Sequence, residues 1–213
     1  MQEKKAFQTK VICLINLDKF DEALSSIERY HDATELFFEK AYCQYRLDKF
    51  TEAYDTLIKC EQPSYKEKEL LAQISYRLEN YQEAYNNYRD IIKNVDDDFE
   101  VERLTNLSAV VANLKSTNPE VKKDLDMTEN EDKTFELCFN SACMSLSKGQ
   151  YTEAQEKLVK AEKMCNETFT DPDDQDDLER EITVIRAQLA YCLQKLGESD
   201  NALKIYTNVL KTR

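Results

Sequence analysis

Two Tyr-Arg pairs, Tyr45-Arg46 and Tyr76-Arg77, carry the side chains of this sequence that are best suited to recognition. Tyrosine offers a large contact area, and arginine offers forked donors for a carboxylate or a main-chain carbonyl. Because the pairs occupy the same two places in successive repeats, we predict that they line one peptide-binding surface. An alternative stays open: Tyr42 and Arg46, four residues apart, stack on each other, or Arg46 pairs with an acidic residue of a neighbouring repeat.

Catalytic chemistry finds little support in the sequence. It contains no GxGxxG, Walker A, HExxH or GxSxG motif, and its single histidine, His31, leaves almost no scope for a nucleophile–base pair. Glutamates recur, but at positions that we expect in the first turn of a helix, where a carboxylate favours the helix dipole. These are Glu22, Glu52, Glu83 and Glu153. We predict that the chain is not an enzyme and uses no cofactor or metal.

Composition restricts the remaining classes of function. The formal net charge of −13 should repel phosphates, so binding of RNA or DNA by this segment is not expected. The seven cysteines form no CxxC pair, which favours reduced, packed thiols in the cytosol. No apolar run is long enough for a transmembrane helix, and the first residues lack the apolar core of a signal peptide.

An eight-residue phrase recurs along the chain and organises it. It reads LDKFDEAL at 17–24, LDKFTEAY at 47–54 and LENYQEAY at 78–85, with weaker copies KGQYTEAQ at 148–155 and LGESDNAL at 196–203. Apolar residues at helical spacing precede and follow each copy, and glycine and proline are scarce. The pattern predicts an all-α solenoid of antiparallel helix pairs, with the alanine of each phrase at the closest crossing of its pair.

The predicted units cover about 3–32, 34–62, 65–95, 98–133, 134–166 and 177–213, all in one domain. The unit at 98–133 is expected to be degenerate, because its first helix is followed by an irregular insert at 116–133. A second, acidic insert is expected at 166–177. Since neither end shows a polar capping element, we expect the chain to be a fragment of a longer protein.

The pattern resembles the tetratricopeptide repeat family. With the family's alanine placed on Ala53, its other signature positions fall on Phe37, Ala41, Leu47 and Phe50. The resemblance implies a right-handed superhelix. One departure recurs, because the usual glycine of the turn between the helices is replaced in the first three units, by Asp18, Asp48 and Glu79.

In such a superhelix the first helix of each unit lines the concave side, and its residues that do not pack on the second helix face a groove. Asn106 and Asn140 occupy related places, where they either hold a ligand's main chain or bond to the neighbouring turn. His31 is expected to cap a helix or to face solvent. The predicted partner-binding residues are Phe38, Tyr42, Tyr45, Arg46, Gln73, Tyr76, Arg77, Asn106, Asn113 and Phe139.

Longer stretches carry a more specific resemblance. FEKAYCQYRL at 38–47, ERLTNLSAVVANL at 102–114 and ELCFNSAC at 136–143 resemble the repeat region of the family of seventy-two-kilodalton subunits of the signal recognition particle. The resemblance implies that the groove holds a segment of the particle's sixty-eight-kilodalton subunit, in the service of co-translational targeting to the endoplasmic reticulum. It further implies a cytoplasmic particle with nucleolar passage during assembly, and RNA contacts made only by regions outside this chain.

A co-chaperone adaptor is the rival interpretation. Such an adaptor reads the acidic C-terminus of a chaperone through lysines and asparagines on its first units. The predicted groove carries tyrosines, arginines and a glutamine in those places, which argues against this class.

Overall fold

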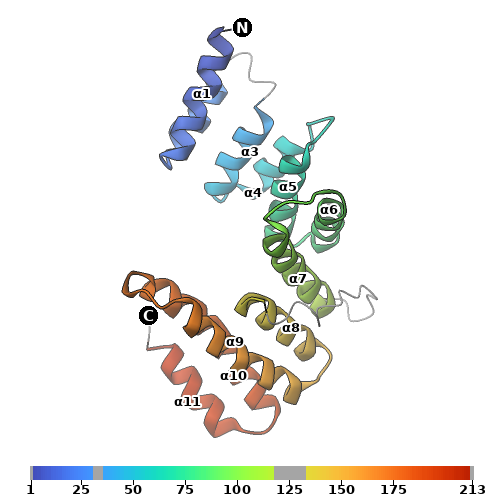
Figure 1. Cartoon of the computed structure of the whole chain (residues 1–213), viewed down its shortest axis with the longest axis vertical. Helices are drawn as coiled ribbons and strands as arrows, with labels where there is room; N and C mark the ends of the chain where they lie inside the picture. The colour runs from blue at the N-terminus through green and yellow to red at the C-terminus, as the bar shows by residue number, and fades with distance from the viewer. Residues whose placement is uncertain (1, 31–35, 118–132, 212–213) are drawn as a thin grey trace. The chain divides into compact units, whose positions relative to one another are not determined.

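The structure is a computed structural model that describes residues 2–30, 36–117 and 133–211. Within those ranges the chain forms α-helices and one short 3-10 helix, and no strand (Figure 1). The chain divides into two compact units, Met1–Glu100 and Val101–Arg213. The predicted all-α class is confirmed.

Three helix pairs build the first unit. Each helix packs on its partner, the second helix of a pair packs on the first helix of the next pair, and the first helices α1, α3 and α5 also touch in sequence. This is the packing of a helical solenoid, as predicted. The pairs are α1 (Gln2–Asn16) with α2 (Phe20–Arg29), α3 (Phe37–Arg46) with α4 (Phe50–Leu57), and α5 (Tyr65–Arg77) with α6 (Tyr81–Asn94).

The turns inside the pairs explain the recurring departure from the family pattern. Asp18, Asp48 and Glu79 have φ angles of 56°, 57° and 61°, the left-handed conformation that Gly149 and Gly197 adopt in the later turns. After each of these residues, a backbone N–H bonds back into the preceding helix, as in the 2.9 Å bond from Lys49 N to Gln44 O. Aspartate tolerates this conformation better than most residues do, whereas glutamate gains no such local compensation.

We expect Glu79→Gly to stabilise the first unit by about 0.5–1 kcal/mol, because glycine removes the left-handed strain and loses only part of that gain to chain entropy. Urea denaturation followed by circular dichroism measures the change. The reverse substitution, Gly149→Ala at φ 74°, should destabilise, although open space surrounds that position. An unstable Glu79→Gly variant would show that the glutamate side chain itself supports the turn.

The alanines of the phrase lie where the helices meet. Ala23, Ala53, Ala84 and Ala154 have no exposed surface, and Ala202 is 3% exposed. Ala53 belongs to a cluster with Leu57 of its own helix and with residues of α3 and α5. The phrase therefore fixes how closely each pair approaches its neighbour, as the sequence indicates.

Helices α8 to α11, and all of α7 except its first residue, belong to the second unit. One core joins α8 to α11 and centres on residues such as Leu158, Cys165 and Leu189. In this part of the chain too, each helix from α8 onward packs on the next. The helices are α7 (Glu100–Thr117), α8 (Phe135–Ser147), α9 (Tyr151–Thr168), α10 (Gln175–Lys195) and α11 (Ser199–Val209).

The acidic insert is shorter than predicted. Helix α9 continues to Thr168, a 3-10 helix, η1, covers Pro172–Asp174, and α10 already begins at Gln175. Asp171 caps the 3-10 helix by accepting a hydrogen bond from Asp173 N, at 3.1 Å. The next acidic residues, Asp176 and Asp177, lie in the first turn of α10, where the helix dipole favours them. The last part of the predicted acidic insert therefore begins a helix.

Two other predictions concern residues that the structure describes only in part or not at all. The predicted irregular insert began at 116, but α7 extends through Thr117; the rest of the insert, 118–132, lies outside the described residues. The position predicted for His31 also lies outside them. In the parts of the chain that are described, no helix is both long and apolar enough to cross a membrane.

Glu153, in the first turn of α9, links that helix to α8. It accepts hydrogen bonds from Lys157 Nζ at 2.9 Å and from Ser145 Oγ at 3.3 Å, and the bond from Lys157 lowers the pKa of its carboxyl. A lowered pKa stabilises the fold above the unfolded-state pKa of glutamate, and this contribution is lost as the pH falls through the folded-state pKa.

We therefore expect Glu153→Gln to lower stability at neutral pH, by less than about 1 kcal/mol because the side chain is 47% exposed. The difference between variant and parent should vanish as the pH falls through the lowered pKa of Glu153. Thermal melts at several pH values test this. A difference that persists in acid would instead point to altered packing.

Candidate partner-binding surface

The predicted binding residues divide between the two units. Seven lie on α3 and α5 in the first unit, and these are Phe38, Tyr42, Tyr45, Arg46, Gln73, Tyr76 and Arg77. The other three, Asn106, Asn113 and Phe139, lie on α7 and α8 in the second unit.

Arg46, at the end of α3, reaches back to the preceding helix pair. Its guanidinium carbon lies 4.3 Å from the centroid of the Phe20 ring, and its Nη2 lies 3.5 Å from Asp18 Oδ1. Its Nη1 donates a 2.9 Å hydrogen bond to Tyr42 Oη, which raises the pKa of the guanidinium. The arginine thus joins two consecutive helix pairs. It contacts an aromatic ring and a carboxylate of the preceding pair and a hydroxyl of its own helix.

Arg77 repeats this arrangement one unit later. Its guanidinium carbon lies 4.8 Å from the Phe50 ring centroid, and its Nη2 lies 3.8 Å from Asp48 Oδ1. Phe50 and Asp48 stand in the second phrase where Phe20 and Asp18 stand in the first. We call this arrangement an arginine latch. It consists of an arginine together with the phrase aromatic and the turn aspartate of the preceding helix pair.

The sequence left open that Arg46 pairs with an acidic residue of a neighbouring repeat. The structure shows such a pair for both arginines, because each lies beside the turn aspartate of the preceding helix pair. Both arginines nevertheless stay accessible, with side chains that are 42% and 52% exposed. Contact with the fold and contact with a partner are therefore compatible at these residues. The partner-binding role of Arg46 and Arg77 stays a prediction.

We expect Arg77→Ala to destabilise the first unit by about 0.5–1 kcal/mol through loss of the cation–π contact with Phe50. Arg77→Lys, which keeps the charge but not the flat guanidinium, should lie between the variant and the parent. Chemical denaturation measures both. A fully stable Arg77→Ala protein would mean that the latch contributes no packing energy.

Aromatic side chains surround the latches. The rings of Phe38 and Tyr42 stack along α3 at a centroid distance of 6.1 Å, and the Tyr42 ring meets Phe20 edge-on at 6.1 Å. Lys66 of α5 places its Nζ 5.1 Å from the Phe38 centroid. Helix α3 thus presents half-buried aromatic rings, with Lys66 of α5 and Arg46 of α3 beside them.

The two tyrosines that precede the arginines pack on the phrase of their own unit. The Tyr45 ring lies 5.7 Å from that of Phe50, and the Tyr76 ring lies 5.6 Å from that of Tyr81. Burial, together with Glu79 and Tyr76 nearby, raises the pKa of the Tyr81 hydroxyl. Phe50 is therefore contacted by Tyr45 of its own unit and by Arg77 of the next.

Gln73 is half-buried on α5, between the positions of Glu69 and Tyr76 along one helix face. In the second unit, Asn113 donates a 3.0 Å hydrogen bond to Ala109 O of its own helix. Phe139 is half-buried against the core of α8 to α11, and Asn106 is half-buried on α7. These four positions leave the predicted binding role untested.

Asn140 resolves an alternative that the sequence left open. Its Nδ2 donates to Ser108 Oγ at 2.8 Å and to Thr105 O at 3.3 Å, both on α7, and its side chain is almost fully buried. The amide therefore ties α8 to α7. It bonds to a neighbouring helix, which is the structural interpretation.

Metal binding and thiol chemistry are two reactivities that cysteine and acidic side chains could support. No cluster of histidine, cysteine, aspartate and glutamate in the described residues could hold a metal ion. Burial raises the pKa of the Cys43, Cys143 and Cys165 thiols to about 11, and all seven cysteines are free thiols. A thiol with so high a pKa is a poor nucleophile at neutral pH.

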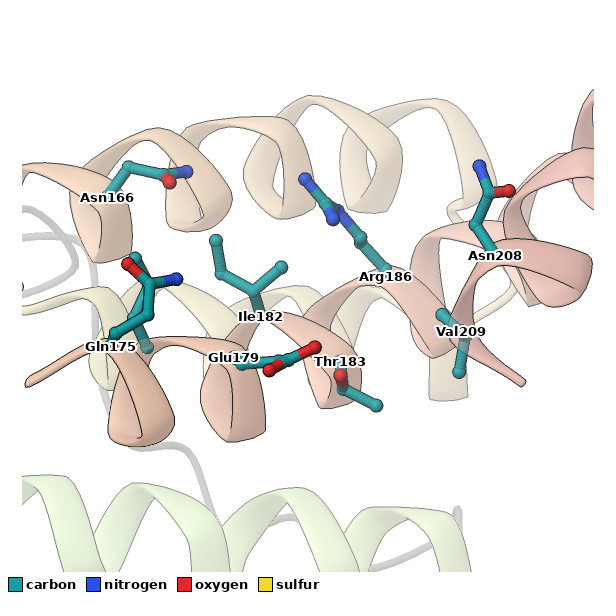
Figure 2. Close-up of a pocket in the computed structure, with 9 residues that line it drawn as sticks. Asn166, Gln175, Glu179, Ile182, Thr183, Arg186, Asn208 and Val209 are labelled. Carbon is teal, nitrogen blue, oxygen red and sulfur yellow. The ribbon is translucent and has the colours of Figure 1, made fainter. Parts of the chain in front are cut away.

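A cavity of about 300 Å³ lies in the second unit, among α9, α10 and α11. Figure 2 shows Ile182 and Arg186 of α10 between Asn166 of α9 and Asn208 of α11. The Nε of Arg186 lies 2.7 Å from Glu162 Oε1 of α9, so this guanidinium already has a carboxylate partner. None of the ten predicted binding residues lines the cavity.

Comparison with known proteins gives this architecture a family. A family model described as "SRP_TPR_like: Putative TPR-like repeat" matches residues 1–112, more than half of the chain. The chain belongs to this TPR-like repeat family of the signal recognition particle. A second model, described as "Tetratricopeptide repeat", matches residues 188–212, which include α11. The family suggested by the sequence is confirmed.

Curated relatives extend the family likeness to nearly the whole chain. The proteins named "Signal recognition particle subunit SRP72" from Canis lupus familiaris and Homo sapiens are each 39% identical over 213 residues. The match covers 98% of this chain and 31% of each relative, so the chain spans less than a third of their length. The chain is thus similar to the tetratricopeptide-repeat region of that subunit.

A solved structure supports the fold independently. The crystal structure of a tetratricopeptide repeat protein from Parabacteroides merdae has a TM-score of 0.69 and covers all of this chain and 80% of its own. Its sequence identity is 16%, so the likeness concerns the fold alone. The helical tetratricopeptide-repeat solenoid is therefore confirmed from both sequence and structure.

The sequence offered an acidic residue of a neighbouring repeat as one possible partner of Arg46, but it did not identify which residues the arginines contact. Phe20, Phe50, Asp18 and Asp48 were interpreted as frame residues of the phrase, and their contact with the next unit's arginine was not assigned. The sequence does contain a pattern that could have indicated this contact. The tetrapeptide LDKF is identical at 17–20 and 47–50, and each copy lies one repeat before a Tyr-Arg pair.

Proposed function

We propose that this chain is a non-catalytic scaffold within a signal recognition particle subunit, and that it holds a segment of the particle's sixty-eight-kilodalton subunit. Family membership and the relatives named as a signal recognition particle subunit support the particle. Sequence resemblance supports the identity of the partner. The surface of α3 and α5 supports the place of binding.

One observation carries the proposed place of binding. Tyr45 and Arg46 of α3 recur as Tyr76 and Arg77 at the matching positions of α5, and these side chains are held in place by the fold while remaining partly exposed. Preorganised aromatic and arginine side chains lose little entropy on binding, which makes them the usual anchors of protein interfaces. A bound segment would find a rigid surface here.

The scaffold would act by position rather than by chemistry. A segment captured on this surface tethers the partner subunit, while RNA is contacted by regions outside this chain, in keeping with the net charge of −13. In this role the chain supports co-translational targeting to the endoplasmic reticulum from the cytoplasm, with nucleolar passage during assembly of the particle.

Calorimetric titration of the chain with the sixty-eight-kilodalton subunit, and with segments of it, tests the proposal. We expect saturable binding that Tyr45→Ala and Arg46→Ala each weaken by about tenfold or more, since truncation of an interface anchor typically costs over 1 kcal/mol. Circular dichroism should show unchanged helix content in both variants.

Lys93→Ala is the matched control, because it also removes one exposed cationic side chain but Lys93 is none of the predicted binding residues, so it should leave the affinity unchanged. Failure of the subunit and of all its segments to bind would refute the partner. Binding that both substitutions leave intact would refute the surface. Tighter binding of an acidic chaperone tail would favour a co-chaperone adaptor.

A further inference from the structure

The charges around the arginine latches bear on which segment the surface of α3 and α5 accepts. We infer that this surface selects a segment rich in apolar and basic side chains and discriminates against an acidic one. The inference rests on the proposed function for the existence of a bound segment. It goes further by naming the chemistry of that segment.

The arginines that could read a carboxylate already face one. Arg46 Nη2 lies 3.5 Å from Asp18 Oδ1, and Arg77 Nη2 lies 3.8 Å from Asp48 Oδ1. The two aspartate side chains are 77% and 80% exposed, so a ligand approaching either guanidinium also meets a carboxylate in water. An acidic ligand would have to approach each arginine against a like charge.

Further carboxylates share the same helix faces. Glu39 precedes Tyr42 and Arg46 by three and seven residues, and Glu69 precedes Gln73 and Tyr76 by four and seven. Glu39 Oε1 accepts a long, 3.5 Å hydrogen bond from the uncharged side-chain amide of Gln8 on α1. Both α3 and α5 therefore carry an acidic residue on the same helix face as their predicted binding residues.

The lysines of α5 offset only part of this charge. Lys68 Nζ lies 2.6 Å from Asp90 Oδ2, so that lysine is paired within the fold. Lys66 Nζ lies over the Phe38 ring and adds positive charge at one edge of the surface. With the whole chain at −13, the field that a distant ligand meets is also negative.

Apolar surface supplies the other half of the selectivity. The stacked rings of Phe38 and Tyr42 on α3 are partly open to solvent. Burying such surface gains roughly 25 cal/mol per Å², whereas the aspartates and glutamates contribute mainly to on-rate and selectivity. A segment with alternating apolar and basic residues satisfies both.

Two labelled peptides with identical leucine and tyrosine positions, one with lysine and one with glutamate at all other positions, test the selectivity by fluorescence anisotropy. We expect the lysine peptide to bind at least about tenfold more tightly at low salt, with an affinity that falls as NaCl screens the charges. Equal binding, tighter binding of the glutamate peptide, or binding of neither would overturn the inference.

Charge variants of the chain locate the effect. Asp18→Asn and Asp48→Asn keep a residue that tolerates the left-handed turn, and each should weaken the lysine peptide about two- to fivefold, the range of one exposed charge pair. Lys66→Gln should strengthen it. Asp98→Asn, an exposed change beyond α6, is the matched control and should have no effect. Unchanged affinity in both turn variants would overturn the assigned charges.

The same variants separate this inference from the proposed function. If the sixty-eight-kilodalton subunit binds the chain but binds more tightly as salt is raised or when Asp48 is replaced, the selectivity is wrong while the scaffold role stands. If the subunit does not bind while the lysine peptide does, the selectivity stands and the partner is wrong.

Discussion

Leu158→Ala should lower the free energy of unfolding by about 2–5 kcal/mol, the largest effect expected of any single change considered. Leu158 has no exposed surface and lies within the core that joins α8 to α11. Truncation to alanine removes the transfer energy of three carbon atoms and leaves a cavity that surrounding helices fill only in part. Urea denaturation monitored by circular dichroism measures the loss.

Val159→Ala is the matched control for Leu158→Ala. Val159 is the next residue of α9 and is 52% exposed, so its truncation should change stability by less than about 0.5 kcal/mol. Equal losses in the two variants would mean that the observed burial on α9 does not describe the protein in solution. Together, the pair assigns the inward face of the helix.

Ala53→Leu should destabilise the first unit by about 1–3 kcal/mol through overpacking. Ala53 is fully buried in a cluster that includes Ala41 of α3 and Leu70 of α5. The added carbon atoms have no space at this crossing, so they force the helices apart or strain the side chains around them. Chemical denaturation should show a lower midpoint.

Thr51→Leu controls for the change in composition, because Thr51 is exposed on the same helix, two residues earlier, and should tolerate leucine. A neutral Ala53→Leu variant would contradict the role assigned to every alanine of the repeated phrase. The same comparison can be repeated at Ala84, which is equally buried in α6.

The fold followed from the sequence where one physical requirement dominates. The alanine of each phrase was predicted at the closest crossing because only a small side chain fits there, and all five alanines are buried. Helices α5 and α6, Tyr65–Arg77 and Tyr81–Asn94, fill the unit predicted at 65–95. Strong helical periodicity and a turn between two long apolar patterns leave little freedom at such places.

Helix ends were harder to predict where charge and backbone geometry compete. The acidic run after α9 reads as a loop by composition, yet Asp176 and Asp177 stabilise the first turn of α10. The turn residues Asp18, Asp48 and Glu79 looked like departures from the repeat, yet they adopt the conformation of the glycine that they replace. Local composition alone does not report such backbone choices.

The candidate surface could be predicted only as a set of positions. Helical spacing placed Tyr45, Arg46, Tyr76 and Arg77 on matching faces of α3 and α5. Spacing could not show that Arg46 lies on Phe20, because that contact depends on how two consecutive helix pairs pack. Residues far apart in sequence meet only through tertiary packing, so the latches required the structure.

Hydroxyl-radical footprinting of the chain with and without the sixty-eight-kilodalton subunit shows directly whether the partner binds on α3 and α5, since it reports the solvent access of individual side chains. We expect Phe38, Tyr42, Tyr45 and Tyr76 to become protected on binding, while Phe99, which is 58% exposed beyond α6, keeps its reactivity. Protection confined to residues outside α3 and α5, or no protection at saturating subunit, would contradict binding on this surface.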